Sequence, residues 1–118
     1  MKVIVGPRAS GKTTELINIA HETDQYIVVP NERRKRFTFK MAKDIGKPIR
    51  NPITIDEMVY GSFERSMYAR YHEPPTVLMD DAQSVLENLL HGVRIDALTI
   101  SSDYAPLVLS VGDCGGNM

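Results

Sequence analysis

The sequence predicts an α/β protein, a three-layer α/β/α sandwich built on a mainly parallel sheet. Two observations lead to this class. Short β-branched runs alternate along the chain with longer segments of helical periodicity, as in parallel strands joined by crossover helices. In addition, a glycine-containing turn follows the first apolar run, and two adjacent carboxylates follow the fourth.

Six short runs rich in valine, isoleucine or leucine are the expected strands. Their composition is typical of buried parallel strands, because β-branched side chains pack well on a pleated surface. The strands are expected at residues 3–5, 26–29, 53–55, 77–79 and 97–100, with a further candidate at 107–111. Pro74 and Pro75 break the chain just before the fourth of these strands.

Four segments between these runs have the pattern of helices. They are expected at residues 12–23, 32–45, 56–71 and 82–90. In the first segment Leu16, Ile17 and Ala20 fall on one side of a helix. Asp56 is the expected N-cap of the third helix, because it follows a strand and precedes apolar residues at helical spacing. The His-Gly pair at 91–92 should end the fourth helix.

Length and composition favour one globular domain. We expect residues 1–111 of the 118 to form it and residues 112–118 to be a flexible tail. The net charge of −1 gives no overall attraction to nucleic acid or to an anionic membrane. No apolar stretch approaches a membrane span, and because a strand is predicted at the very start, we expect no signal peptide. A single cysteine, Cys114, excludes an internal disulfide and favours a reducing cytoplasm.

Residues 6–13 read GPRASGKT and fit the pattern G-x-x-x-x-G-K-[ST] at every fixed position. Backbone N–H groups of such a loop wrap a polyphosphate, and the following helix points its positive end at it. Lys12 would reach the β- and γ-phosphates and assist catalysis, and the Thr13 hydroxyl would ligate Mg²⁺. Gly6 and Gly11 stand where a Cβ would obstruct the turn or the approach of phosphate. The residues expected to bind the nucleotide are Gly6, Pro7, Arg8, Ala9, Ser10, Gly11, Lys12, Thr13 and Thr14. The alternative is an ordinary turn in which Lys12 is merely solvated.

The expected strand at 77–79 ends in Asp80 and Asp81. In a phosphate-loop fold this strand neighbours the strand that carries the loop, so its terminal carboxylate points at the metal. Asp80 would then bind Mg²⁺, through water, and Asp81 would be the catalytic residue that activates the attacking water. The alternative is that both residues simply cap the helix that begins at Ala82.

The order of these motifs resembles the P-loop NTPases of the additional-strand, RecA-like class, and in particular the first motor domain of superfamily-one helicases. GPRASGKT is similar to motif I. Residues 27–34 (IVVPNERR) resemble motif Ia, and residues 51–57 (NPITIDE) resemble the next strand end. Residues 77–83 (VLMDDAQ) are similar to motif II, with Asp81 in place of glutamate and Gln83 retained. The shorter side chain of Asp81 leaves the rate of hydrolysis open.

This resemblance implies Mg²⁺-dependent binding and hydrolysis of ATP. Those helicases also use a second motor domain, which these 118 residues do not contain. We therefore expect a compact stand-alone ATPase of the phage type, coupled to DNA handling and located in the cytoplasm, or in the host cytoplasm if a phage encodes it. ATP is favoured over GTP because the guanine-selecting pattern N-K-x-D is absent.

Two other functions stay open. One is a nucleotide-dependent switch or assembly module with little turnover, which the aspartate at position 81 and the lack of an internal arginine finger favour. The other is a small nucleotide or metabolite kinase. Against the kinase, Arg94 is the one arginine between the acidic strand and the end of the sequence, so no arginine-rich lid is evident.

Basic charge is concentrated between residues 31 and 50, where the sequence has eight basic residues and two acidic ones. The run Arg33, Arg34, Lys35 and Arg36 would contact the backbone of a single-stranded nucleic acid. The alternatives are a solvated helix face and an arginine that senses phosphate on a neighbouring subunit. We accordingly expect a protein partner or self-association to complete the site.

Overall fold

The structure is a computed structural model, and it describes residues 2–7, 9–61, 76–100 and 107–110. Within these residues it is an α/β protein, which confirms the predicted class. Its strands are β1 (Lys2–Val5), β2 (Ile27–Val29), β3 (Ile53–Thr54), β4 (Leu78–Met79) and β5 (Leu107–Ser110). Its helices are α1 (Lys12–Thr23), α2 (Glu32–Asp44), α3 (Ile55–Tyr60) and α5 (Ala82–Leu89).

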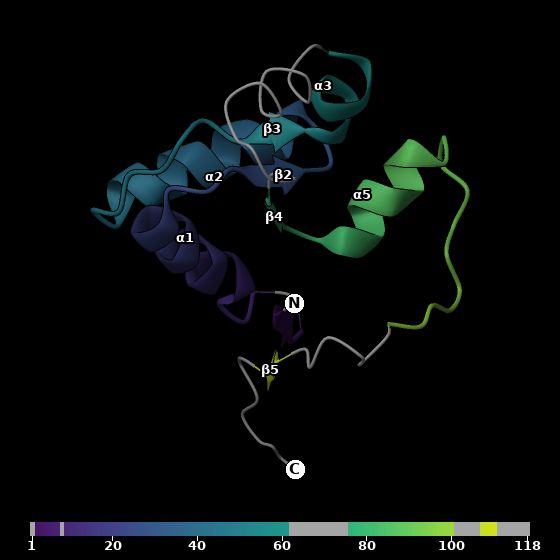
Figure 1. Cartoon of the computed structure of the whole chain (residues 1–118), viewed down its shortest axis with the longest axis horizontal. Helices are drawn as coiled ribbons and strands as arrows, with labels where there is room; N and C mark the ends of the chain where they lie inside the picture. The colour runs from purple at the N-terminus through teal and green to yellow at the C-terminus, as the bar shows by residue number, and fades with distance from the viewer. Residues whose placement is uncertain (1, 8, 62–75, 101–106, 111–118) are drawn as a thin grey trace.

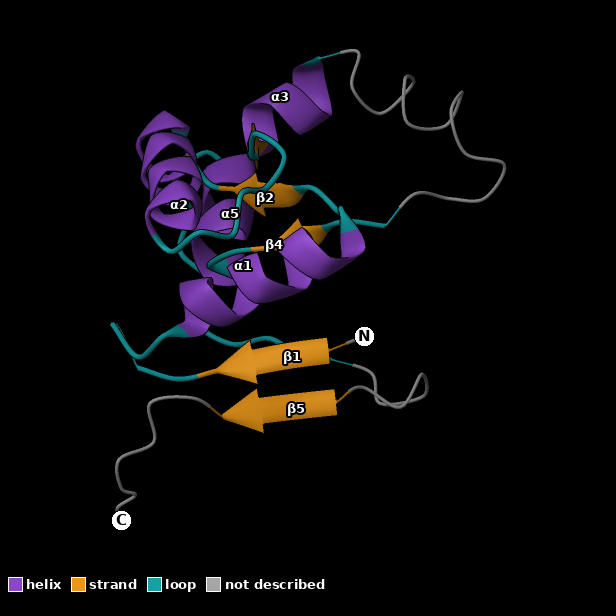
Figure 2. Ribbon diagram, turned by 90° about the vertical axis from the view of Figure 1, so that its left-hand side faces the viewer, coloured by secondary structure: helices purple, strands orange, loops and turns teal. Residues whose placement is uncertain are grey.

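The described strands form two parallel sheets. In the larger sheet β2 lies between β3 and β4, with Val28 opposite both Ile53 and Met79. In the smaller sheet β1 pairs with β5, and Figure 2 shows this pair below α1, apart from the larger sheet. The expectation that the acidic strand neighbours the loop-bearing strand is therefore wrong for the described ladders, because the backbone of β4 bonds to β2.

The core lies on both faces of β2. Ile27 and Val29 face α1 and α2 and join a cluster with Ile17, whereas Val28 faces the other way and packs with Ile55 of α3 and Val85 of α5. None of the three β2 side chains is more than 1% exposed. A continuous apolar run suits such a strand, because both of its faces are covered. Figure 1 shows the result, with α1 and α2 on one side of β2 and α5 on the other.

The segment at 97–100, predicted as a strand, forms none. The side chains of Leu98 and Ile100 remain 55% and 49% exposed. Composition alone does not make a strand, since strand stability comes from a partner edge and a face to bury. The other predicted strands and the helices predicted at 12–23, 32–45 and 82–90 are confirmed, with shifts of a residue or two at their ends where the structure describes them. The continuous helix predicted at 56–71 is wrong, because α3 ends at Tyr60 and Gly61 follows it with an extended backbone. Residues 62–71 of the predicted third helix, and the expected tail at 112–118, lie outside the described residues.

The N-cap of α3 is Thr54, so the prediction of Asp56 is wrong. The Thr54 hydroxyl accepts a hydrogen bond from the Glu57 N–H at 3.1 Å, and the Glu57 carboxylate accepts one from the Thr54 N–H at 3.0 Å. This reciprocal pair satisfies two backbone donors, which a lone aspartate cannot do. The predicted end of the fourth helix, α5, is confirmed. The residues at 91–92 follow α5 with φ values of 59° and 89°.

In the part of the chain that the structure describes, every helix is too short or too polar to span a lipid bilayer.

Candidate functional site

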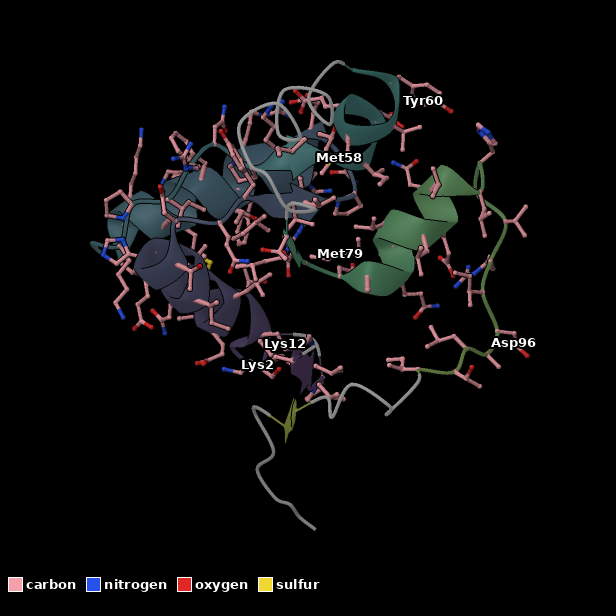
Figure 3. The ribbon with its side chains drawn as sticks, viewed as in Figure 1. Lys2, Lys12, Met58, Tyr60, Met79 and Asp96 are labelled. Atoms are coloured by element: carbon pink, nitrogen blue, oxygen red, sulfur yellow. The ribbon has the colours of Figure 1, made fainter. Side chains whose placement is uncertain are left out.

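Lys12 is the first residue of α1 and lies where the 6–13 loop meets the helix (Figure 3). Its ammonium donates hydrogen bonds to the carbonyls of Gly6 and Pro7, at 2.5 and 2.6 Å. The side chain is thus folded back against the first residues of its own loop rather than extended into solvent. The positive charge is held inside the loop by two uncharged carbonyl acceptors that an anionic ligand could replace.

The backbone of this loop is held in an unusual conformation. Ala9 has φ of 60° and Gly11 has φ of 95°, both in the left-handed region. A Cβ on Gly11 would meet no protein atom within 4 Å, so the turn itself is not obstructed there, and glycine is favoured by its φ. Left-handed residues other than glycine are costly and concentrate at ligand-binding turns. Arg8 lies outside the described residues.

The hydroxyl of Ser10 is buried and has no hydrogen-bond partner. Unsatisfied buried hydroxyls are rare in folded proteins, since each loses its contacts with water and gains none. Thr14, the last of the expected nucleotide contacts, is half-buried in the first turn of α1. The loop therefore presents an unsatisfied donor beside a concentrated positive charge, which is an arrangement suited to a phosphate group.

Thr13 and Asp80, the two expected metal ligands, lie together. The Thr13 hydroxyl is 3.3 Å from Oδ1 and 3.4 Å from Oδ2 of Asp80. Asp80 is only 6% exposed, and its N–H donates to the Val28 carbonyl at 2.9 Å, which extends the ladder between β4 and β2. The position of the carboxylate is therefore fixed by the sheet, at the end of β4.

Arg34 is the member of the site that the sequence analysis missed. Its Nη2 donates to Asp80 Oδ2 at 2.9 Å and to the Thr13 hydroxyl at 3.3 Å. Its Nε is buried without a hydrogen-bond partner. The sequence carries one signal for this placement. Asn31 caps α2 by accepting from the Arg34 N–H at 2.9 Å, so Arg34 lies in the first turn of a helix that begins at the end of β2.

Asp81 caps α5 and has φ of 57°. One carboxylate oxygen accepts from the Ser84 N–H at 3.4 Å, and the other accepts from the Ser84 hydroxyl at 2.6 Å. The capping alternative therefore describes the position of Asp81, whereas Asp80 faces Thr13 and Arg34. In this arrangement the Asp81 carboxylate is engaged with its own helix.

The basic run at 33–36 does not form a single patch. Arg34 turns to Asp80, and Lys35 forms an ion pair of 2.8 Å with Glu57 of α3. That bond from Lys35, together with the backbone N–H of Thr54, holds the pKa of Glu57 below its ordinary value of 4.5. Arg33 and Arg36 are exposed. Only half of the run is thus available to a large partner.

The oxygen donors at the site suit Mg²⁺ that is shared with a ligand. Within the described ranges no three His, Cys, Asp or Glu residues gather as a metal cluster. Thr13 and Asp80 supply a hydroxyl and a carboxylate, both hard oxygen donors. Mg²⁺ is commonly held by one or two carboxylates, with water and substrate phosphates completing its shell. The pair fits such a shared site and does not fit a site made by protein alone.

Comparison with known proteins assigns no family. The chain matches no protein-family model, no curated protein and no solved structure. The candidate site is therefore defined by its own geometry: Lys12 in the loop, with Arg34, Thr13 and Asp80 in mutual contact.

Proposed function

We propose that the protein binds a nucleoside triphosphate, preferably ATP, together with Mg²⁺ at the 6–13 loop and hydrolyses it. The observation that carries the proposal is the contact between Thr13 and Asp80, which are 67 positions apart. A turn of glycine and serine residues alone would not explain why a buried carboxylate from another sheet lies against the residue that follows Lys12.

The proposal includes the fold, a three-layer sandwich of the P-loop NTPase type. Helices on both faces of β2 support it, as does the strand–loop–helix order of β1, the 6–13 loop and α1. The described strands make two sheets. We therefore propose, beyond these two described sheets, that the strands belong to one continuous sheet.

The residues have separate roles in this mechanism. The loop amides and Lys12 would bind the phosphates, with the ammonium exchanging the carbonyls of Gly6 and Pro7 for phosphate oxygens. Thr13 and Asp80 would hold Mg²⁺, which supplies charge neutralisation to the phosphates when bound. Asp81 would orient a water molecule in line with the γ-phosphate and accept its proton, after its carboxylate leaves Ser84. The products would be the nucleoside diphosphate and inorganic phosphate.

The engagement of Asp81 with Ser84 favours a second candidate, a nucleotide-dependent switch with little turnover. The carboxylate that would serve as the base has both oxygens hydrogen-bonded within α5. A protein with this arrangement binds nucleotide but hydrolyses it slowly until a partner rearranges the start of α5. Self-association or a protein partner would then control the active state.

Equilibrium binding of ATP with Mg²⁺, followed by phosphate release, tests these functions. The variants are Lys12→Ala and Lys40→Ala, the second being a matched control. Lys40 is exposed and pairs with Asp44 on its own helix at 2.8 Å. We expect Lys12→Ala alone to weaken binding. Binding with turnover supports the ATPase, and binding without turnover supports the switch. Transfer of phosphate to an added nucleoside or nucleotide would select a kinase. A folded wild-type protein that does not bind ATP would overturn the proposal.

A nucleic-acid partner remains part of the proposal in a narrower form. Arg33 and Arg36 are exposed and lie three positions apart in α2, so they share one side of the helix. The double variant Arg33→Gln/Arg36→Gln should weaken single-stranded DNA binding and reduce its dependence on salt. Lys2→Gln, which removes an exposed positive charge from β1, is the control, and equal loss in both variants would contradict a specific role. A cytoplasmic location is likewise proposed, with the single cysteine as its support.

A further inference from the structure

We propose that Arg34 acts within its own chain on the terminal phosphate of the bound nucleotide, and that without nucleotide its guanidinium rests on Thr13 and Asp80. This inference rests on the proposed function, because it concerns the same site. It differs from the arginine expected from a neighbouring subunit, since the residue is supplied by α2 of the same chain.

The guanidinium of Arg34 and Mg²⁺ would compete for the same oxygen atoms. Nη2 of Arg34 lies 2.9 Å from Asp80 Oδ2 and 3.3 Å from the Thr13 hydroxyl. These are the two side chains that would hold Mg²⁺. A guanidinium and a divalent cation repel each other and cannot both occupy this position. Binding of Mg²⁺ with the nucleotide must therefore move the guanidinium away from Thr13 and Asp80.

The backbone of Arg34 is held in place by its neighbours. Asn31 caps α2 through the Arg34 N–H. The turn before it is tied to α5, because the side-chain amide of Asn88 donates to the Pro30 carbonyl at 2.5 Å. A displaced guanidinium consequently swings about a fixed Cα in the first turn of α2. It stays beside the 6–13 loop and the phosphates that the loop would hold.

The guanidinium of Arg34 also has an unused hydrogen-bond donor. Its Nε is buried and has no acceptor. Its central carbon lies 5.0 Å from the centroid of the Phe37 ring, so a flat apolar surface supports one part of the group. Arginine binds phosphate through two donors of its planar fork, which leaves its faces free to stack. A phosphate oxygen would supply the acceptor that Nε lacks.

A structural ion pair is the competing explanation for Arg34, and nucleotide selectivity separates the two roles. A γ-phosphate contact favours ATP over ADP, whereas a purely structural pair affects both nucleotides alike. Arg33 is a matched control, because it has the same charge and lies next to Arg34 but is exposed. Arg34→Lys keeps a cation beside buried Asp80 but removes the planar fork. This variant should therefore remain folded even if Arg34→Gln does not.

The experiment measures equilibrium dissociation constants for ATP and ADP, each with Mg²⁺, in wild type, Arg34→Gln, Arg34→Lys and Arg33→Gln. Thermal unfolding without nucleotide establishes which variants are folded. We expect the preference for ATP over ADP to fall by about tenfold or more in Arg34→Gln and by a smaller factor in Arg34→Lys. We expect Arg33→Gln to match wild type.

An ATP preference that is unchanged in folded Arg34→Lys and Arg34→Gln would overturn the inference. If Arg34→Gln does not fold, Arg34→Lys alone decides. A failure of the proposed function would give a different result. In that case wild type itself would not bind ATP with Mg²⁺, or Lys12→Ala would bind it as tightly as wild type does.

Discussion

The hydroxyl of Thr13 lies 3.3 Å from one carboxylate oxygen of Asp80 and 3.4 Å from the other, although 67 positions separate these residues. Thr13 belongs to the helix that follows β1, and Asp80 follows β4 in the other sheet. Arg34 bridges them from a third element, α2. Three segments that are distant in sequence thus place a hydroxyl, a carboxylate and a guanidinium around one point.

The contact between Asp81 and Ser84 yields the first prediction. Ser84→Ala removes the hydroxyl that donates to one Asp81 oxygen at 2.6 Å, but it leaves the backbone N–H that donates to the capping carboxylate. If Asp81 activates water, the freed carboxylate should raise the rate of phosphate release severalfold with nucleotide affinity unchanged. The cost should be about 1 kcal/mol or less of the free energy of unfolding. Single-turnover phosphate release and denaturant unfolding measure the two effects.

Asp81→Asn is the control for that experiment. Asparagine caps helices as well as aspartate does, so the fold should be retained while the base is lost. We expect this variant to bind nucleotide and release almost no phosphate. A rate in Asp81→Asn equal to that of wild type would show that Asp81 is not the base.

The left-handed φ of Gly11 leads to the second prediction. Gly11→Ala adds a Cβ that meets no atom within 4 Å, so its effect comes from a φ of +95° alone. Gly46→Ala is a matched variant at the end of α2, with φ of +75° and equally open surroundings. Each variant should lower the free energy of unfolding by about 1 kcal/mol. Only Gly11→Ala should weaken ATP binding, which calorimetric titration measures. Equal affinities in the two variants would argue against the loop as the binding site.

The third prediction concerns pH and the ion pair between Lys35 and Glu57. Lys35 and the Thr54 N–H lower the pKa of Glu57 below 4.5 in the folded state. The ionised carboxylate therefore stabilises the fold fully above pH 4.5, and this contribution is lost as pH falls through the lowered pKa. Glu57→Gln keeps the capping geometry and removes the charge. The Glu57 side chain is 45% exposed, so the loss at pH 7 should be only about 0.5 kcal/mol.

Denaturant unfolding of wild type and Glu57→Gln at pH 7 and at about pH 3 checks this sign. The difference between the two proteins should shrink at the lower pH. A difference of the same size at both pH values would mean that the effect comes from the shape of the side chain and not from its charge.

Local patterns were enough to predict part of this molecule. The turn before α1 and the apolar run of β2 carry their signals within a few adjacent residues, so their elements were predicted correctly. The prediction of Asp56 as the N-cap of α3 is wrong, although the sequence does carry the signal for Thr54, because Glu57 lies three positions after it and completes a capping box.

The remaining features depend on contacts between distant segments. The run at 97–100 has the composition of a strand, but in the described structure it pairs with no other strand. In the sequence Arg34 is one member of a basic run, and most charge runs face solvent. Its actual direction follows from the parallel pairing of β2 and β4, which brings the start of α2 to the same edge of the sheet as Asp80. No short window of sequence contains that relationship.

The central claim is that Thr13 and Asp80 hold Mg²⁺ for a nucleotide bound by the 6–13 loop. The most direct test is equilibrium binding of ATP with Mg²⁺ and with a chelator, in wild type and in Asp80→Asn. Asp56→Asn, an exposed aspartate in the first turn of α3, is the control. We predict that wild type and Asp56→Asn bind ATP at least about tenfold more tightly with Mg²⁺ than with the chelator, and that Asp80→Asn loses this difference. Binding by folded Asp80→Asn that depends on Mg²⁺ as strongly as wild type does would contradict the claim.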